Sequence, residues 1–252
     1  HLVLNSIRNF RVKHKDKYGE IVICTDCHGS WRKGVFPQYK AHRKIKREKQ
    51  KTQEGMDWSA LFKTINDIII EIDTHFPYKV IAVPHAEGDD VIAVLAKNIQ
   101  EKSIIISSDK DFSQLHRYKH IKQYSPIQKK MLVTSDPYKY LQEHIIRGDK
   151  GDGVPNILSA DDCIVNGERQ KPITKKKLAV WMEQTEMANG LSAKWKRNQQ
   201  LIDFEYIPEN ISKGIMDSYN KTKDEQKQGQ LLNYFITNRL KYLMENIEDF
   251  IR

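Results

Sequence analysis

The chain has 252 residues, and its 42 lysines and arginines outnumber its 33 acidic residues, which gives a formal net charge of +9. Its apolar runs are far shorter than the ~20 apolar residues that a membrane-spanning helix needs. Its three cysteines do not form the even set that is typical of a secreted disulfide scaffold. We therefore expect a basic globular protein of the cytoplasm, without a membrane partner.

The first half of the chain alternates between two apolar patterns. Helical spacing of apolar residues predicts helices over residues 2–10, 58–75 and 87–100. Short runs rich in β-branched residues predict strands at residues 20–24, 79–83 and 103–107. We expect six side chains of the second helix to face a core: Leu61, Phe62, Ile65, Ile68, Ile69 and Ile72. This alternation indicates an α/β fold, with a mostly parallel sheet that helices cover.

The second half of the chain is predicted to be helical. Residues 121–124 and 131–133 can still pair as a hairpin or add to the edge of the sheet. After Asp136 the apolar spacing predicts helices near residues 173–187, 193–202, 210–219 and 230–247. The sequence therefore predicts an α/β core over residues 1–135 and an α-helical region over residues 136–252.

Most of the net positive charge lies in one segment of the predicted core. Residues 32–51 contain nine basic residues and one acidic residue, Glu48, which is a net charge of +8. A lysine-rich segment is usually a solvated loop, but here Trp31, Phe36 and Tyr39 alternate with the cations. Cations interleaved with aromatic surfaces are typical of nucleic-acid binding, so we expect DNA or RNA to bind this segment.

Acidic residues follow each predicted strand and recur in a glycine-rich turn at residues 148–155. The four clusters are Asp26; Glu87, Asp89 and Asp90; Asp109 and Asp111; and Asp149 and Asp152. A single Asp after a strand is usually a helix cap or a turn residue. Ligands of open α/β sheets bind outside the carboxyl ends of the strands, so four clusters at that edge indicate one shared site.

Such a group of carboxylates needs a counter-charge, because it would otherwise raise pKa values or destabilise the fold. Oxygen-rich sites with few histidines select Mg²⁺ or Mn²⁺. Two such ions ~4 Å apart can activate a water molecule and stabilise the leaving oxygen in phosphodiester cleavage. The alternative is ion pairing with lysines, which fits residues 87–90 poorly because no lysine lies within helical reach before Lys97.

The pair Cys24 and Cys27 has the spacing of a zinc or redox motif. A zinc site needs four ligands, and Cys163 with scattered histidines does not complete one. Cys24 also lies inside a predicted strand. We therefore expect these cysteines to be buried and structural.

Six motifs, taken in order, resemble those of the flap-endonuclease and 5′-nuclease family, which includes the nuclease domains of bacterial DNA polymerases and the phage ribonucleases H. The matching segments are residues 31–33, 39–43, 87–93, 107–115, 148–155 and 201–208. The first two resemble the basic arch of the family, and the next two resemble its second and third acidic motifs. The segment 148–155 resembles the entrance of its helix–three-turn–helix motif. The resemblance extends from about residue 21 to the C-terminus.

The resemblance implies a PIN-like nuclease core with an arch at about residues 31–55, followed by the helix–three-turn–helix region. It implies a Mg²⁺-dependent nuclease, with Mn²⁺ able to substitute, that acts from the 5′ ends of RNA–DNA hybrids, duplex DNA and flaps. Its expected role is removal of RNA primers in phage-type DNA replication, in the host cytoplasm. Its expected partners are DNA and RNA–DNA hybrids, with a single-strand-binding protein and a sliding clamp as further candidates for a monomeric enzyme.

The resemblance also assigns roles to residues of this sequence. Two metal ions would be held, directly or through water, by Asp26, Glu87, Asp89, Asp90, Asp109, Asp111, Asp149 and Asp152. Catalytic roles would belong to Lys40, Arg43, Asp109 and Asp111. Nucleic acid would contact Arg32, Lys33, Lys40, Arg43, Lys44, Arg47, Gly148, Gly151 and Gly153.

The sequence departs from the family pattern in two places. Family members begin with a strand that carries an acidic ligand and lies in the middle of the sheet. The sequence here begins inside what resembles the next helix, so we expect it to be incomplete at its N-terminus. Bacterial members also carry a Gly-Ile-Gly turn after the position of Pro155, and residues 156–168 lack it, which leaves a potassium site without its usual sequence.

Two other functions remain open at this point. A ribonuclease of the broader PIN class would act on single-stranded RNA, but the helical region and the turn at residues 148–155 disfavour it. A duplex-binding replication accessory protein would use the acidic residues only structurally. The absence of the first strand would favour this second alternative.

Overall fold

The computed structural model describes residues 1–184, 190–221 and 230–251. The strands are β1 (Val22–Cys24), β2 (Lys79–Ile81), β3 (Ser103–Ile106), β4 (Ile121–Ser125) and β5 (Lys130–Leu132). The first helices are α1 (Leu2–Tyr18), α2 (Arg32–Val35), α3 (Ala41–Glu54), α4 (Trp58–His75), α5 (Gly88–Asn98) and the 3₁₀ helix η1 (Asp111–Arg117). The later helices are α6 (Pro137–Arg147), α7 (Lys175–Met182), α8 (Ser192–Ile202), η2 (Phe204–Tyr206), α9 (Glu209–Asn220), α10 (Gln230–Thr237), α11 (Lys241–Met244) and α12 (Glu248–Ile251).

The five strands form two small sheets. Strand β1 pairs in parallel with β2, and β3 pairs in parallel with β4. Strand β5 runs antiparallel to β4, so both alternatives for residues 121–133 are realised, the hairpin and the sheet edge. The expected single sheet is wrong in this detail, because no strand of the described residues joins β1–β2 to β3–β4–β5. Strand β1 is consequently half-buried along its length.

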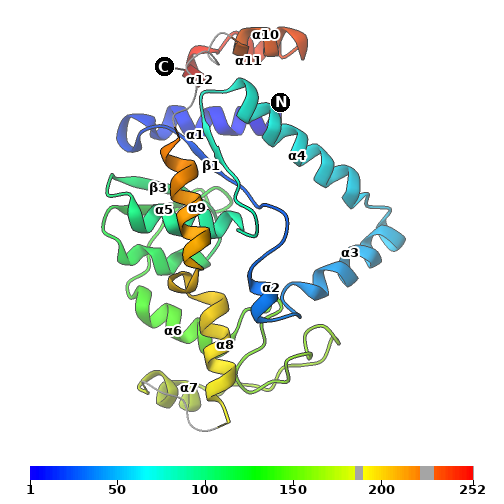
Figure 1. Cartoon of the computed structure of the whole chain (residues 1–252), viewed down its shortest axis with the longest axis vertical. Helices are drawn as coiled ribbons and strands as arrows, with labels where there is room; N and C mark the ends of the chain where they lie inside the picture. The colour runs from blue at the N-terminus through cyan, green and yellow to red at the C-terminus, as the bar shows by residue number, and fades with distance from the viewer. Residues whose placement is uncertain (185–189, 222–229, 252) are drawn as a thin grey trace.

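Helices from the second half of the chain complete the cores of the first half. Helix α9 packs on α5, and its Ile211 and Ile215 join a cluster with Val91 and Ile105. Figure 1 shows α9 lying across the body beside α5. A second cluster contains residues of α1 and α4 together with residues of α10, α11 and α12. The two regions expected from the sequence therefore share their apolar clusters.

Helices α3 and α4 project away from the body and meet at Gly55 (Figure 1). The cap of α4 is as predicted, since the Asp57 carboxylate accepts a hydrogen bond from the Ala60 amide at 3.0 Å. The prediction that its apolar face is inward is wrong for three residues, which are about 40% exposed: Leu61, Phe62 and Ile65. Only Ile72 of this face is fully buried, because only the last turns of α4 reach the body.

Three predicted helices differ from the observed ones. The helix expected at residues 2–10 is α1, which continues to Tyr18. The helix expected at residues 173–187 is α7, which ends at Met182, and residues 185–187 lie outside the described residues. The helix expected at residues 230–247 is interrupted at Arg239, whose φ of 54° ends α10. No helix in the described ranges combines the length and apolar character that crossing a membrane requires.

Candidate metal and nucleic-acid site

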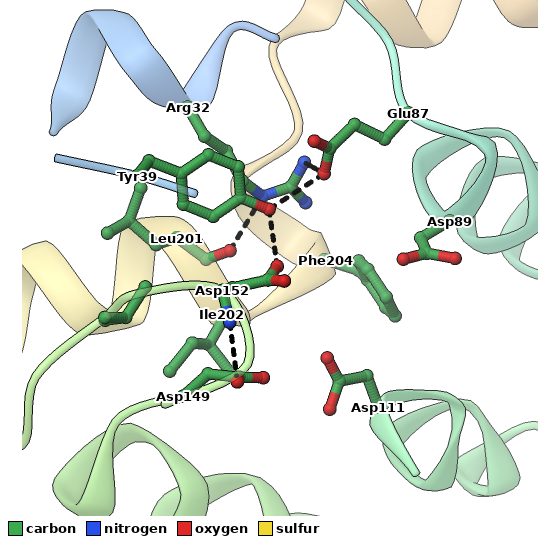
Figure 2. A pocket seen from close by; sticks show the side chains of 11 residues that line it. Arg32, Tyr39, Glu87, Asp89, Asp111, Asp149, Asp152, Leu201, Ile202 and Phe204 are labelled. Carbon is green, nitrogen blue, oxygen red and sulfur yellow. Dashed lines mark hydrogen bonds and ion pairs between the residues drawn. The ribbon is translucent and has the colours of Figure 1, made fainter. Parts of the chain in front are cut away.

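The acidic residues come from four places in the fold. Asp26 follows β1; Glu87, Asp89 and Asp90 lie at the start of α5; Asp109 and Asp111 lie between β3 and η1; Asp149 and Asp152 lie in the turn after α6. Five of their carboxylates line one cavity, and Figure 2 shows them around a common space: Glu87, Asp89, Asp111, Asp149 and Asp152. The structure thus brings together acids that are up to 65 residues apart in the sequence.

Burial and mutual repulsion raise the pKa of two of these carboxylates. Burial raises the pKa of Asp89 to about 7, and the charges of Asp109, Glu87 and Asp26 add to the shift. Burial also raises the pKa of Asp111, where Asp149, Asp109 and Asp152 contribute. Asp109 therefore acts on both groups of acids. The cavity has one acidic side around Asp89 and another around Asp111. A bound cation would stabilise each side.

Asp26 and Asp109 lie beside this cavity and also order the backbone near it. Asp26 Oδ1 accepts a hydrogen bond from the Gly88 amide at 2.7 Å, at the N-terminus of α5. Asp109 Oδ1 accepts one from the Asp111 amide at 3.0 Å, at the start of η1. Each carboxylate keeps a second oxygen that can serve a metal ion.

Asp90 and Arg32 form a buried ion pair that positions the start of α5. The Arg32 guanidinium donates to both carboxylate oxygens of Asp90, at 2.7 and 3.0 Å, and to Glu87 Oε2 at 3.3 Å. Its Nε donates to the Leu201 carbonyl at 2.8 Å, so Arg32 on α2 links α8 with α5. The Trp31 indole and the Glu87 amide both donate to Asp90 Oδ2.

This pair corrects two expectations for individual residues. Asp90 is 0% exposed and both its oxygens accept hydrogen bonds, so it has no free oxygen for direct contact with a metal ion. Arg32 is 3% exposed, so its guanidinium cannot reach a nucleic acid. The sequence placed both among functional residues because burial cannot be read from a charged motif.

The base of the arch supplies the cations that face the cavity. Lys40 Nζ donates to Glu87 Oε1 at 2.8 Å and lies 3.6 Å from Asp152 Oδ2. Arg43 donates to Asp152 Oδ1 at 2.6 Å and to the Gly151 carbonyl. Burial alone would raise the pKa of Glu87, but the cations of Lys40 and Arg32 outweigh it and hold this pKa below its ordinary value. The arch cations therefore partly neutralise the acids.

The expectation of aromatic surfaces for stacking is wrong for two of the three residues. Phe36 and Tyr39 are buried in a cluster with α6 and α8. The Tyr39 hydroxyl lies 2.8 Å from Glu87 Oε2 and 2.6 Å from Asp152 Oδ2, so its single proton is shared between two carboxylate acceptors. Trp31 is half-buried beneath Arg32.

The remaining basic residues of the arch point to solvent. Lys33, Lys44 and Arg47 are exposed, and Lys44 and Arg47 lie on α3. The Arg47 guanidinium lies 4.7 Å from the ring centre of Phe62 on α4. These side chains are free to contact a phosphate backbone.

The turn at residues 148–155 packs against the arch. Gly148 has φ of 67°, and a Cβ there would lie 2.4 Å from the Val154 carbonyl oxygen. Gly153 has φ of 75°, and a Cβ there would lie 2.8 Å from His42 Nδ1. The Gly153 amide donates a hydrogen bond to the Lys150 carbonyl, and the Lys40 amide donates one to the Asp152 carbonyl. Glycine is thus required for the close contact of this turn with itself and with the arch.

One residue near the acids has no signal in the sequence. His144 on α6 lies with Nε2 3.4 Å from Asp149 Oδ2 and Nδ1 3.5 Å from Asp111 Oδ1. Burial alone would lower the pKa of His144, but the two carboxylates outweigh it and raise this pKa. A lone histidine on an amphipathic helix is unremarkable in sequence, and only the packing of α6 on η1 brings it here.

Burial and the charge of Asp89 raise the pKa of the Cys24 thiol, but among the described residues no cysteine belongs to a cluster with metal-ligand spacing. Cys24 ends β1 as predicted, but Cys24 and Cys27 are half-buried and not fully buried. Cys163 is buried elsewhere, and all three are free. Among the described residues, the cluster with metal-ligand spacing is Asp111, His144 and Asp149, whose ligand atoms lie within 4.8 Å of one another.

Two family models match the chain and together cover nearly all of it. Residues 1–144 match the model described as 5′-3′ exonuclease, N-terminal resolvase-like domain. Residues 138–250 match the model described as T4 RNase H, C terminal.

Characterised proteins show the same likeness. Ribonuclease H of Enterobacteria phage T4 is 34% identical over 267 residues, which covers 99% of this chain and 86% of that protein. Flap endonuclease Xni of Shewanella pealeana is 35% identical over 139 residues, which covers 51% of this chain and 49% of that protein.

Solved structures of a bacteriophage T5 nuclease share the fold. The T5 flap endonuclease, in a complex with DNA and metal ions, superposes with a TM-score of 0.64 at 17% identity over 85% of this chain and 88% of that one. The T5 5′-exonuclease with bound zinc ions gives 0.59 at 18% identity, over 85% of this chain and 89% of that one. Together with the two family models, these matches confirm the predicted PIN-like nuclease core followed by a helical region.

Proposed function

Because the chain belongs to the 5′-3′ exonuclease family, we propose that it is a divalent-metal-dependent 5′ nuclease of the ribonuclease H and flap endonuclease type. The proposed substrates are RNA–DNA hybrids, duplex DNA and 5′ flaps. The proposed role is removal of RNA primers during phage-type DNA replication in the host cytoplasm. The observation that carries this proposal is the meeting of acids from three segments in one cavity, with Asp26 near it, directly beside the basic arch.

The donor set of the cavity fits a pair of divalent cations. Most available donors are carboxylate oxygens, which Mg²⁺ and Mn²⁺ prefer. Asp89, Asp109 and Asp26 would hold an ion on one side, and Asp111 and Asp149 on the other. When bound, such ions lower the pKa of a water nucleophile and neutralise charge on the phosphate.

Other residues of the chain would position the acids and stabilise charge on the phosphate. Arg32 and Asp90 fix the start of α5, and through it the positions of Glu87 and Asp89. Lys40 and Arg43 neutralise Glu87 and Asp152 in this structure. Once cations occupy the acidic groups, the two arch side chains are available to donate to the scissile phosphate and to stabilise the charge that develops there.

The exposed cations of α3 would bind the phosphate backbone away from the cavity. Lys44 and Arg47 of α3, and Lys33 of α2, face solvent and form no ion pair with the rest of the described residues. Phosphate contacts position a substrate without reading its sequence. This arrangement fits a nuclease that selects the structure of its substrate rather than its base sequence.

The proposal is tested by removing the carboxylate that acts on both acidic groups. We expect Asp109→Asn to lower Mg²⁺-dependent release of 5′-labelled nucleotides from an RNA–DNA hybrid at least about 100-fold, because it removes charge from both sides of the cavity. Asp67→Asn, on the exposed face of α4, is the matched control and should leave the rate unchanged.

Parallel substrates separate the proposed activity from its alternatives. Hybrid, 5′-flap and blunt duplex substrates should be cleaved in preference to single-stranded RNA. Preference for single-stranded RNA would indicate a PIN-class ribonuclease. An accessory protein without catalysis would bind the duplex substrates, and cleavage would be negligible with the unaltered protein and with Asp109→Asn alike.

A further inference from the structure

His144 is held between two acids that come from different elements. Its side chain is 14% exposed, and its two ring nitrogens face Asp111 and Asp149 at 3.5 and 3.4 Å. Nδ1 is inaccessible to solvent and has no hydrogen-bond partner among the described residues. An unpaired buried nitrogen is unfavourable, so this geometry is incomplete without a further group.

The spacing of these atoms fits ligands of one cation. Firm N–H···O hydrogen bonds are ~2.9 Å long, and both separations exceed that distance. Two ligands at right angles on an ion, each about 2.1–2.2 Å away, lie about 3 Å apart. A small approach of the side chains would therefore place one ring nitrogen and a carboxylate oxygen on a shared ion.

The ring has little freedom to turn away. Helix α6 buries Leu141, Ile145 and Ile146 against the body and packs on η1, which carries Asp111. Tyr140 lies with its ring centre 5.8 Å from that of His144, in an edge-on arrangement. The helix therefore fixes the imidazole over the gap between the two carboxylates.

We propose that His144 is a nitrogen ligand of the cation held by Asp111 and Asp149. One ring nitrogen binds the ion. The other carries a hydrogen and donates a hydrogen bond to the carboxylate that it faces, and this hydrogen bond sets the tautomer. This inference rests on the proposed function, since it concerns one of the two metal positions proposed above. It makes the two positions unequal, because the groups near Asp89 that are proposed to hold the other ion are the carboxylates of Asp109 and Asp26.

The inequality has a consequence for the choice of metal. Imidazole binds Mn²⁺ and later transition metals more readily than Mg²⁺, which is a hard cation that prefers oxygen. The position beside His144 should therefore prefer Mn²⁺ to Mg²⁺ more strongly than the position beside Asp89.

The test uses Mn²⁺ as a spectroscopic probe on the whole chain without substrate. Pulsed electron paramagnetic resonance detects the ¹⁴N hyperfine coupling of an imidazole bound to Mn²⁺. We expect this coupling in the unaltered protein and its loss in His144→Gln, which keeps a hydrogen-bonding group. Calorimetry should show at least about a 10-fold weaker Mn²⁺ affinity for one of two ions, with a smaller change for Mg²⁺.

His120→Gln is the matched control, because His120 contacts the Ala96 carbonyl away from the acids. Far-ultraviolet circular dichroism and the melting temperature check that both variants fold. Stoichiometric Mn²⁺ binding without ¹⁴N coupling, or coupling that persists in His144→Gln, overturns the assignment and leaves the proposed nuclease function intact. A protein that binds no divalent cation contradicts both.

Discussion

Lys40 is held in an unusual conformation at the edge of the acidic cavity. Its φ of 58° is left-handed, which costs a non-glycine residue about 1 kcal/mol or more. Its amide donates to the Asp152 carbonyl and its ammonium group to Glu87. The strain is maintained because backbone and side chain are both anchored to acidic segments, which places the cation where a phosphate would arrive.

The role of Lys40 is measurable with a neutral side chain of similar length. We expect Lys40→Met to lower the cleavage rate about 100-fold, because charge on the phosphate loses a donor, while Mg²⁺ still binds. Single-turnover cleavage and calorimetry measure the two quantities separately. Lys44→Met, on the exposed side of α3, is the control for loss of one arch charge. Equal rate losses in both variants would show that Lys40 acts only through long-range attraction.

The raised pKa of Asp89 predicts a pH dependence of stability in the metal-free protein. A carboxyl with a higher pKa in the folded state stabilises the fold fully below its unfolded value. The pKa of Asp89 rises from 3.8 in the unfolded state to about 7 in the folded state, and this contribution is lost as the pH rises between these two values. The difference corresponds to up to about 4 kcal/mol in the free energy of unfolding at pH 8. His14, His42 and His116 have lowered pKa values and act in the opposite direction, so a variant is needed to isolate Asp89.

Asp89→Asn isolates this contribution. In the presence of a chelator we expect the variant to be more stable than the unaltered protein at pH 8 and equally stable near pH 4. Urea unfolding at several pH values measures the difference. Added Mg²⁺ should stabilise the unaltered protein at pH 8 and have less effect on the variant, because the variant has lost a ligand. A difference that does not vary with pH would contradict the assignment of the shift to Asp89.

At the scale of an element, α4 changes its environment along its length. Its first turns belong to the arch and expose Ile65, whereas Ile72 in its last turn is buried against the body. We expect Ile72→Ala to lower the free energy of unfolding by about 2–5 kcal/mol, because it leaves a cavity. Ile65→Ala should cost less than about 1 kcal/mol. Urea unfolding of both variants tests this, and equal losses would show that the arch packs against the body.

The pattern along α4 also shows what sequence can predict of an element. Its apolar spacing and its Asp57 cap specify a helix, and both are observed. The spacing cannot specify what lies opposite each turn, so the same pattern covers an exposed arch and a buried end. The acids were located by their position after strands, a local feature, whereas His144 joins them only through the packing of α6 on η1.

For the whole molecule, the alternation of elements predicts the fold class, but not how the chain closes its cores. Residues of α9 complete the cluster around α5, and residues of α10 and α12 complete the cluster around α1. Such contacts join segments more than 100 residues apart, and the sequence carries no local signal for them. Burial of Arg32 with Asp90 is of the same kind, since α8 and α5 enclose the pair.

The concentration of charge on the arch predicts how binding depends on salt. Residues 32–51 carry a net charge of +8 out of +9 for the whole chain. Each phosphate that a cation neutralises adds about −0.9 to the slope of log K against log salt for duplex DNA. We expect the double substitution Lys44→Gln and Arg47→Gln to make this slope shallower by up to about 2, measured by fluorescence anisotropy with a flap substrate in Ca²⁺. Lys241→Gln, on α11 beside Glu245, should leave the slope unchanged. An unchanged slope in the double variant would show that DNA binds away from α3.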